Sequence, residues 1–262
     1  MTDTSNMFTD GKAYERMMGR WSRVAGGLFL DWLKQPDQLR WLDVGCGNGA
    51  FTEELINRCH PAAVDGVDPS AEQIAFASDR PGAKQAHFQV GDAQALPFAE
   101  NSFDAATMAL VIAFVPDPAK ALTELARVVR PGGWVAAYMW EIPEHTPLAP
   151  LHRTLKAMGL EPTQPPSSAI AQPAALQELW RKTGLAAVET RPLRIQVTHD
   201  NLEDFCASNV VPLGPQARIV AAMTPETKAQ LKERLRAALP IAADGSITYE
   251  ATAHAVKGQV PS

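Results

Sequence analysis

The sequence lacks an excess of positive charge. Its 262 residues hold 24 lysines and arginines against 29 aspartates and glutamates, which gives a formal net charge of −5. A protein binds a nucleic-acid backbone mainly through basic side chains that displace counterions from the phosphates. We therefore expect that nucleic acid is not the main partner of this chain.

Long apolar runs are also missing. The sequence contains no run of about 18 apolar residues, the length that a membrane-spanning helix needs. The segment 1–12 is polar and lacks the apolar core of a signal peptide. We expect no membrane span and a cytoplasmic protein.

Cysteine is scarce. Cys46, Cys59 and Cys206 follow neither a metal-binding spacing nor the even count of a disulfide framework. We expect free thiols, a reducing compartment and no bound metal.

Apolar residues are plentiful and follow clear periods. They make up 46% of the chain, which excludes wholesale disorder. From Tyr14 to Leu33 they recur every three or four residues, which predicts an N-terminal helix within residues 10–35. From 39 to 140, short apolar strands alternate with helices, and this predicts a parallel sheet covered on both faces. We expect the strands at residues 41–44, before Asp68, and at 86–90, 103–109 and 134–139, with Arg130-Pro131-Gly132-Gly133 ending the helix before the last of them.

The pattern changes after Trp140. Helices are expected at 148–158 and 174–183, and a strand at 188–197 with a kink or bulge at Pro192. Residues 199–242 read as a helical insertion before a last strand at 247–255. We expect a single domain over 1–262, in which 39–140 binds a cofactor and the insertion forms a cap.

Three alternate glycines mark the first strand–helix turn. Asp43-Val44-Gly45-Cys46-Gly47-Asn48-Gly49 lets the backbone turn tightly and approach a ligand, beside the N–H groups of the next helix. Asp68 ends the second strand, 23 residues after Gly45, where a carboxylate accepts ribose hydroxyls. The loop alone fits a nicotinamide cofactor as well as another adenosine-containing one.

Other motifs distinguish between these cofactors. Gly91-Asp92-Ala93 follows the third strand, Leu96-Pro97-Phe98 precedes the fourth, and Arg130-Pro131-Gly132-Gly133 precedes the fifth. With the DxGxGxG loop, this order resembles the class I S-adenosylmethionine-dependent methyltransferases, of the group that includes ubiquinone/menaquinone C-methyltransferases. The resemblance implies a doubly wound, seven-stranded, mostly parallel α/β sheet of order 3-2-1-4-5-7-6, with the last strand antiparallel. It also implies S-adenosylmethionine as cofactor and S-adenosylhomocysteine as product.

The resemblance also implies roles for single residues. Gly45, Cys46 and Gly47 would pack against the methionine part of the cofactor, and Asp43 would support the loop and the amino group. Asp68, followed by Pro69, would accept both ribose hydroxyls. Asp92 and the Ala93 N–H would bind the adenine edge, and Leu110 would lie near the sulfonium methyl.

The segment Tyr14-Glu15-Arg16-Met17-Met18-Gly19-Arg20-Trp21-Ser22 is similar to one that lies over the cofactor pocket in some family members. Arg20 would then pair with the methionine carboxylate and Tyr14 would close the site. The alternative is that Tyr14 and Trp21 make ordinary core contacts and Arg20 is a solvated charge.

Catalytic residues are less clear. A general base is needed only if the acceptor must lose a proton, and His145, His152 and His199 are the candidates. No Asn-Pro-Pro-Tyr type motif follows the fourth strand; the apolar run Ala109 to Phe114 favours a small, partly hydrophobic acceptor. Acceptor selection is expected in the N-terminal helix and in residues 141–170 and 200–240, with Trp21, Phe205 and Leu213 available to cover the acceptor. A nicotinamide-dependent oxidoreductase and a non-catalytic cofactor-binding protein are the alternative functions.

Overall fold

One mixed sheet organises the chain. The computed structural model describes residues 19–211 and 216–262. Seven strands form the sheet in the order β3-β2-β1-β4-β5-β7-β6, and β7 runs antiparallel to both β5 and β6. The predicted strand order and the antiparallel last strand are confirmed. The strands are β1 (Arg40–Val44), β2 (Ala63–Asp68), β3 (Ala86–Val90), β4 (Phe103–Ala109), β5 (Val129–Trp140), β6 (Ala186–His199) and β7 (Ile247–Gln259).

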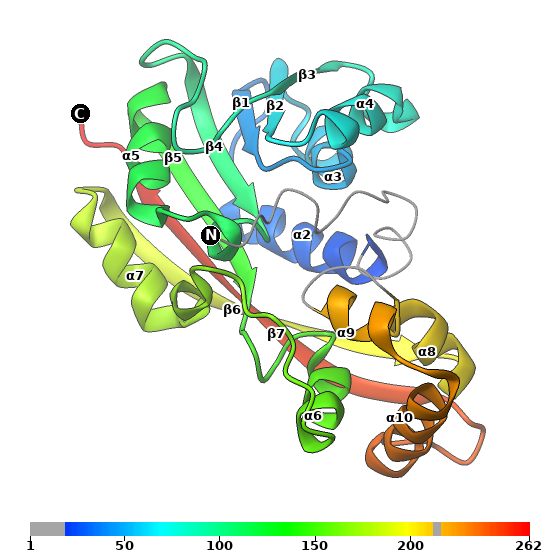
Figure 1. Ribbon diagram of the computed structural model, residues 1–262. Coiled ribbons are helices and arrows are strands. Elements are labelled where there is room, and N and C mark those ends of the chain that lie inside the picture. Colours follow the sequence, from blue (N-terminus) through cyan, green and yellow to red (C-terminus); the bar gives the residue numbers. More distant parts are fainter. Residues whose placement is uncertain (1–18, 212–215) are drawn as a thin grey trace.

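Helices cover both faces of this sheet (Figure 1). Two helices begin at capping side chains: the Ser70 side chain accepts the Gln73 N–H, and the Asp117 side chain accepts the Lys120 N–H. The helices are α2 (Arg20–Leu33), α3 (Ala50–Cys59), α4 (Ala71–Asp79), α5 (Pro118–Val128), α6 (Ala149–Ala157), α7 (Pro173–Lys182), α8 (Leu202–Asn209), α9 (Ala217–Ala222) and α10 (Pro225–Ala238), with the short 3₁₀ turns η2 (Pro81–Ala83), η3 (Ile112–Phe114) and η4 (Ser168–Ala171).

The start of β5 differs from the prediction. The strand begins at Val129, which pairs with Phe103, whereas the next pair joins Ala105 to Trp134. The intervening residues bulge out of the ladder, and Gly132 adopts a φ of +79° there. A Cβ on Gly133 would lie 2.5 Å from the Asp104 carbonyl oxygen. The two glycines therefore let β5 pass close to β4 within one strand instead of separating a helix from a later strand.

The prediction of a kink or bulge at Pro192 is wrong. Pro192 pairs with His254 in regular register, and the irregularity lies between Ala186 and Glu189. β6 is the edge strand of the sheet. A proline on an edge strand loses no ladder bond when its missing N–H faces away from the neighbouring strand, so the ladder continues through it.

The last two strands extend beyond the rest of the sheet. Trp140, the last residue of β5, pairs with Ala253, while Ile247 to Thr252 pair with β6. Helices α8, α9 and α10 follow β6 and precede β7, and α6 lies beside them on this extension (Figure 1). Apolar residues from these elements form a second core, apart from the main one: Leu151, Leu155, Leu202, Phe205, Leu231, Leu235, Leu239 and Ile247. The predicted helical insertion thus packs around the outer end of the β6–β7 pair.

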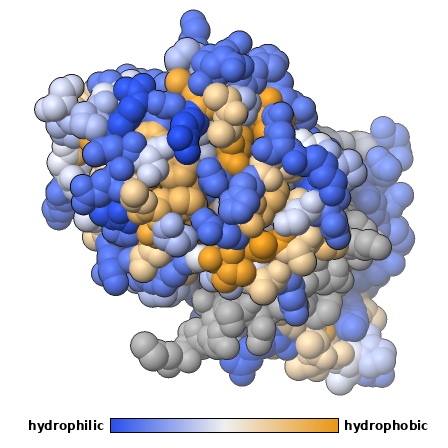
Figure 2. Space-filling view, turned by 90° about the horizontal axis from the view of Figure 1, so that it is seen from above, coloured by the Kyte–Doolittle hydropathy of each residue, from blue (hydrophilic) through white to orange (hydrophobic). Residues whose placement is uncertain are grey.

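The surface seen from above is largely hydrophilic, with apolar residues gathered toward the middle of the face (Figure 2). Within the described ranges, no helix is long and apolar enough to cross a membrane.

Candidate functional site

The glycine loop joins β1 to α3. Gly45, Gly47 and Gly49 have φ values of +73°, +51° and +77°, in the left-handed region that favours glycine. The N–H groups of Gly45 and Cys46 donate to the Val67 carbonyl oxygen over 2.7 and 3.0 Å, which ties the loop to β2. A Cβ on Gly45 would lie 2.4 Å from a Val111 methyl carbon, whereas a Cβ on Gly47 would meet nothing within 4 Å. Gly45 is therefore packed against protein, and Gly47 faces open space.

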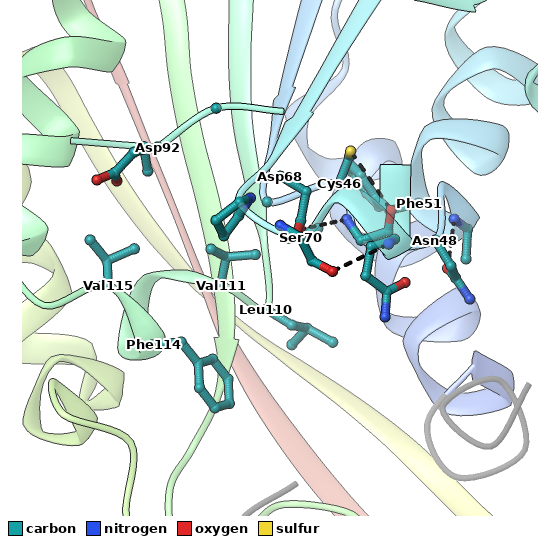
Figure 3. Close-up of a pocket in the computed structure, with 18 of the residues that line it drawn as sticks. Cys46, Asn48, Phe51, Asp68, Ser70, Asp92, Leu110, Val111, Phe114 and Val115 are labelled. Carbon is teal, nitrogen blue, oxygen red and sulfur yellow. Dashed lines mark hydrogen bonds between the residues drawn. The ribbon is translucent and has the colours of Figure 1, made fainter. Parts of the chain in front are cut away.

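That open space belongs to a cavity of about 500 Å³. It lies at the carboxyl ends of the strands, where open α/β sheets bind their ligands. Figure 3 shows the glycine loop and Asp68 on one side of it, Asp92 farther along, and Leu110, Val111 and Phe114 on the β4 side. The lining residues are Gly19, Ser22, Gly45, Cys46, Gly47, Asn48, Ala50, Phe51, Asp68, Pro69, Ser70, Gln73, Gly91, Asp92, Ala93, Gln94, Ala109, Leu110, Val111, Phe114, Val115, Pro116 and Tyr138.

Asp68 connects two parts of the cavity wall. One carboxylate oxygen accepts the Gly47 N–H over 3.0 Å, and the other accepts the Ser70 N–H over 2.9 Å. Burial raises the pKa of Asp68, and the two backbone donors act against that rise. Each carboxylate oxygen keeps a further lone pair. Asp68 is thus held in place and retains acceptor capacity toward a ligand.

Asp92 lies at the other end of the cavity, on the loop after β3. Its carboxylate accepts the Gln94 N–H over 2.9 Å and lies 3.2 Å from the Gln94 amide nitrogen. These are the contacts of an aspartate that stabilises its own turn. Because the same residue lines the cavity, the turn also fixes where its free acceptor positions lie.

A half-buried ion pair on α5 holds the rest of this loop. Arg127 donates to the Phe98 and Leu96 carbonyl oxygens over 2.8 and 3.1 Å, and Glu124 accepts the Leu96 N–H over 2.8 Å. Arg127 and Glu124 also contact each other over 2.7 Å. The guanidinium holds the pKa of Glu124 below its usual range. The Leu96-Pro97-Phe98 motif is thereby fixed beside the cavity by side chains from a different element.

The wall opposite the glycine loop is apolar. Leu110 follows β4 with a φ of +63°, which is uncommon for a residue with a branched side chain, and its N–H donates to the Tyr138 carbonyl oxygen over 2.9 Å. Tyr138 packs against Phe51, with ring centroids 6.0 Å apart. Among the described lining residues, Asp68 and Asp92 are the carboxylates and none is lysine, arginine or histidine. The cavity therefore combines two fixed acceptors with an apolar wall after β4.

Asp43 is not among the lining residues. It is fully buried, and one carboxylate oxygen accepts the Thr52 hydroxyl over 2.6 Å; the other has no hydrogen-bond partner. Burial raises the pKa of Asp43 to about 7, against the lowering effect of the Thr52 hydrogen bond. The structure thus places Asp43 beneath the glycine loop, bonded to α3, and not at the cavity wall.

None of the three candidate histidines lines the cavity. His145 is exposed and pairs with Glu141 over 2.9 Å. His152 lies on α6, where burial lowers its pKa. His199 is buried and pairs with Asp204 over 3.2 Å. The structure therefore does not bring these side chains to the place where an acceptor would meet the cofactor.

Trp21 and Phe205 were expected to cover the acceptor, but both are buried in packed cores and neither lines the cavity. The other predicted site residues fall into two groups. Gly45, Cys46, Gly47, Asp68, Pro69, Asp92, Ala93 and Leu110 all line the cavity. The predictions for Tyr14, for the Arg20 side chain and for Leu213 lie outside the described part of the chain. Within that part, no group of three or more histidine, cysteine, aspartate or glutamate side chains is placed to hold a metal ion.

Several lining residues were not predicted from the sequence. Phe51 and Tyr138 come from α3 and β5. In the sequence each of them has the pattern of an ordinary buried position, so nothing nearby in the sequence indicates that it lines a cavity. Their place in the cavity depends on β5 lying next to β4. Ser22, whose segment was expected over the pocket, reaches the cavity on α2, which packs against α3.

Comparisons with known proteins agree with this geometry. Residues 42–137 match the family model described as a methyltransferase domain. An O-methyltransferase from Aspergillus sclerotiorum is 33% identical over 63% of this chain and 60% of its own length. A 2-phytyl-1,4-naphtoquinone methyltransferase from Synechocystis is 39% identical over 47% of this chain and 49% of its own. The matched region thus spans less than two thirds of the length of these relatives.

Solved structures share the fold. A methyltransferase-like structure from Bacillus halodurans superposes with a TM-score of 0.61 at 16% identity, covering 90% of this chain and 99% of that one. Phosphoethanolamine N-methyltransferase 2 from Haemonchus contortus, solved in complex with S-adenosyl-L-methionine, gives a TM-score of 0.58 at 20% identity, covering 96% of this chain and 56% of that one. Together with the sequence matches, they confirm the resemblance to class I S-adenosylmethionine-dependent methyltransferases.

Proposed function

We propose that this protein transfers a methyl group from S-adenosylmethionine to a small-molecule acceptor and releases S-adenosylhomocysteine. The observation that carries the proposal is a single cavity shared by the open face of Gly47, the carboxylate of Asp68 and the apolar residues after β4. This set matches the needs of a ligand with an amino-acid end, a ribose and a reactive centre that must be kept from water.

The residues fit such a cofactor. The N-terminal end of α3, behind the glycine loop, favours a negatively charged or electron-rich group, and a Cβ at Gly47 would extend into free space. Asp68 retains acceptor positions for two hydroxyls. Asp92 and the backbone of Ala93 lie along the same cavity for the adenine edge. A volume of about 500 Å³ falls within the range of small-molecule sites.

The cofactor, when bound, supplies a methyl group on a sulfonium sulfur, which already has a good leaving group. The chain's own residues orient the cofactor and the acceptor and remove water from around them. Asp68 and the glycine loop fix the ribose and methionine parts, and Leu110 and Phe114 keep water from the reacting centre. No histidine is among the described lining residues. We therefore propose an acceptor that can lose its proton, if it must, without a general base from these residues.

The similar proteins support a small-molecule acceptor, since they include an O-methyltransferase and a naphthoquinone methyltransferase. The apolar wall after β4 supports an acceptor with an apolar part next to the nucleophile. We propose that residues within 10–35, 141–170 and 200–240 select it, because the glycine loop and both aspartates are committed to the cofactor. The three cysteines are free, which supports a reducing compartment and the cytoplasm as the place of action.

Titration with S-adenosylhomocysteine and with NADH tests the cofactor. We expect calorimetry to show binding of the first and not of the second, and weaker binding of the first in Asp68→Ala. Binding of NADH alone would favour the oxidoreductase. Incubation with methyl-labelled S-adenosylmethionine and pooled metabolites then tests catalysis: label in a small molecule supports the enzyme, and binding without transfer from any pool supports a non-catalytic cofactor-binding protein.

A further inference from the structure

The first turn of α2 forms part of the cavity wall. Gly19 and Ser22 line the cavity, and the Tyr138 hydroxyl donates to the Ser22 carbonyl oxygen over 3.5 Å. Trp21 lies between them in sequence and is 6% exposed, with its ring packed edge-on against His199 at a centroid distance of 5.6 Å. This turn therefore has one side on the cavity and the other on the end of β6.

His199 is a buried polar ring at that end of β6. It is 1% exposed and is also packed against Phe205 and Tyr249, with centroid distances of 5.0 and 6.2 Å. The Asp204 carboxylate lies 3.2 Å from its Nδ1, and the Asn209 amide nitrogen lies 3.5 Å from its Nε2. Asp204 is itself fixed by the Asp200 N–H over 3.2 Å.

An imidazole in this position costs more to bury than an apolar ring unless its nitrogens are paired. The pairing with Asp204 fixes the plane of the ring, and edge-on aromatic contacts depend on that plane. A phenylalanine would fill the space without the hydrogen bond. The histidine thus supplies orientation for Trp21 in addition to packing.

We propose that His199 is a positioning residue for cofactor binding: held by Asp204, it fixes Trp21 and with it the turn of α2 that closes the cavity. The proposal rests on the proposed function. In this arrangement the helices inserted between β6 and β7 act on the cavity through α2, because Asp204 belongs to α8. The contact gives a role to the pair of a buried His199 and a half-buried Asp204, neither of which lines the cavity.

The test is S-adenosylhomocysteine affinity, measured by calorimetry well below the melting temperature. His199→Phe is expected to weaken binding by about tenfold, since it removes a charge-assisted hydrogen bond that orders the wall. Asp204→Asn, which keeps the volume of the side chain, is a milder second variant and is expected to weaken binding in the same direction. Trp21→Leu should weaken binding as well, and the double variant His199→Phe/Trp21→Leu should be no weaker than Trp21→Leu alone, because both changes break one contact.

His254→Phe is the matched control. His254 is also a largely buried histidine paired with a carboxylate, Glu141, over 2.8 Å. It lies on the face of β7 opposite Lys257, whose ammonium contacts Trp32 of α2. This variant is expected to lower the melting temperature and to leave S-adenosylhomocysteine affinity unchanged.

Hydrogen exchange separates failure of this proposal from failure of the proposed function. In His199→Phe, amides of residues 22–26 should exchange faster than in the wild type, while those of α5 should not. Unchanged affinity and unchanged exchange in His199→Phe, or an equal loss of affinity in His254→Phe, would overturn the positioning role. If the wild type binds no S-adenosylhomocysteine, the proposed function fails, and the exchange rates alone decide whether His199 fixes α2.

Discussion

The Asp68 carboxylate accepts the backbone N–H of Gly47 over 3.0 Å and so joins the end of β2 to the glycine loop. The glycine with the open face and the carboxylate proposed for the ribose are therefore one connected unit. A change at Asp68 alters the shape of the loop as well as the acceptor. Because of this double role, we expect a large loss of cofactor affinity when Asp68 is replaced.

Asp68→Ala should weaken S-adenosylmethionine binding more than any other single carboxylate change. The variant loses the acceptor for the ligand and the bond to Gly47, at ~1–3 kcal/mol for hydrogen bonds to a charged group. Calorimetry measures the effect, with Asp92→Ala as the matched carboxylate variant on the same cavity. Equal affinities of the two variants would contradict the assignment of the ribose to Asp68.

Gly45→Ala should lower the stability of the fold, whereas Gly47→Ala should mainly weaken cofactor binding. The new Cβ at position 45 would meet Val111 at 2.4 Å, so the variant should unfold at a lower temperature. The new Cβ at position 47 meets no protein atom within 4 Å, so its cost is the left-handed backbone, about 1 kcal/mol, and it should instead obstruct the cofactor. Thermal melts and calorimetry on both variants check this. Val111→Ala should restore part of the stability of Gly45→Ala and none of the binding of Gly47→Ala.

Asp43 should make stability fall as the pH rises. Burial raises its folded-state pKa from an ordinary 3.8 to about 7, so the folded protein holds this proton more tightly than the unfolded chain does. The stabilisation from that proton is fully present below pH 4 and is lost as the pH rises through about 7.

Asp43→Asn tests this linkage. The variant carries no proton to lose, so relative to the wild type it should gain ~1–4 kcal/mol of unfolding free energy between pH 5 and pH 8. Urea unfolding at several pH values measures the difference. Asp92→Asn, at an exposed carboxylate, is the control and should show no comparable gain. A difference between wild type and Asp43→Asn that stays constant with pH would show that Asp43 is charged throughout.

Arg127→Lys should loosen the loop that carries Asp92. A lysine ammonium cannot reproduce the planar set of bonds to Leu96, Phe98 and Glu124, so we expect a loss of ~1–3 kcal/mol in stability. Faster hydrogen exchange at residues 91–98 and weaker S-adenosylhomocysteine binding should accompany it. Arg130→Lys, at a more exposed ion pair with Asp104, is the control and should cost less than about 1 kcal/mol. The prediction fails if both changes cost the same.

The sequence alone was enough to predict those features that depend on residues near each other in the chain. The alternation of strands and helices and the spacing of the glycine loop are patterns among residues a few positions apart, and the structure has both where they were expected. Asp68 and Asp92 reach the cavity for a related reason. Parallel strands bring their carboxyl ends to the same edge, so a residue at a strand end is placed by the period of the sequence alone.

Only the tertiary structure decided the features that depend on which elements become neighbours. Asp43 has the spacing of a cofactor residue, yet it lies against Thr52 because the side chain of a central strand points toward the helix that covers it. Pro192 is a residue type that usually interrupts a strand, yet β6 continues through it because β6 is the edge strand of the sheet. His199 and Trp21 are 178 positions apart, and they meet because the β6–β7 extension passes the start of α2. Contacts of this kind arise from packing between distant segments, for which no period or motif in the sequence gives a local signal.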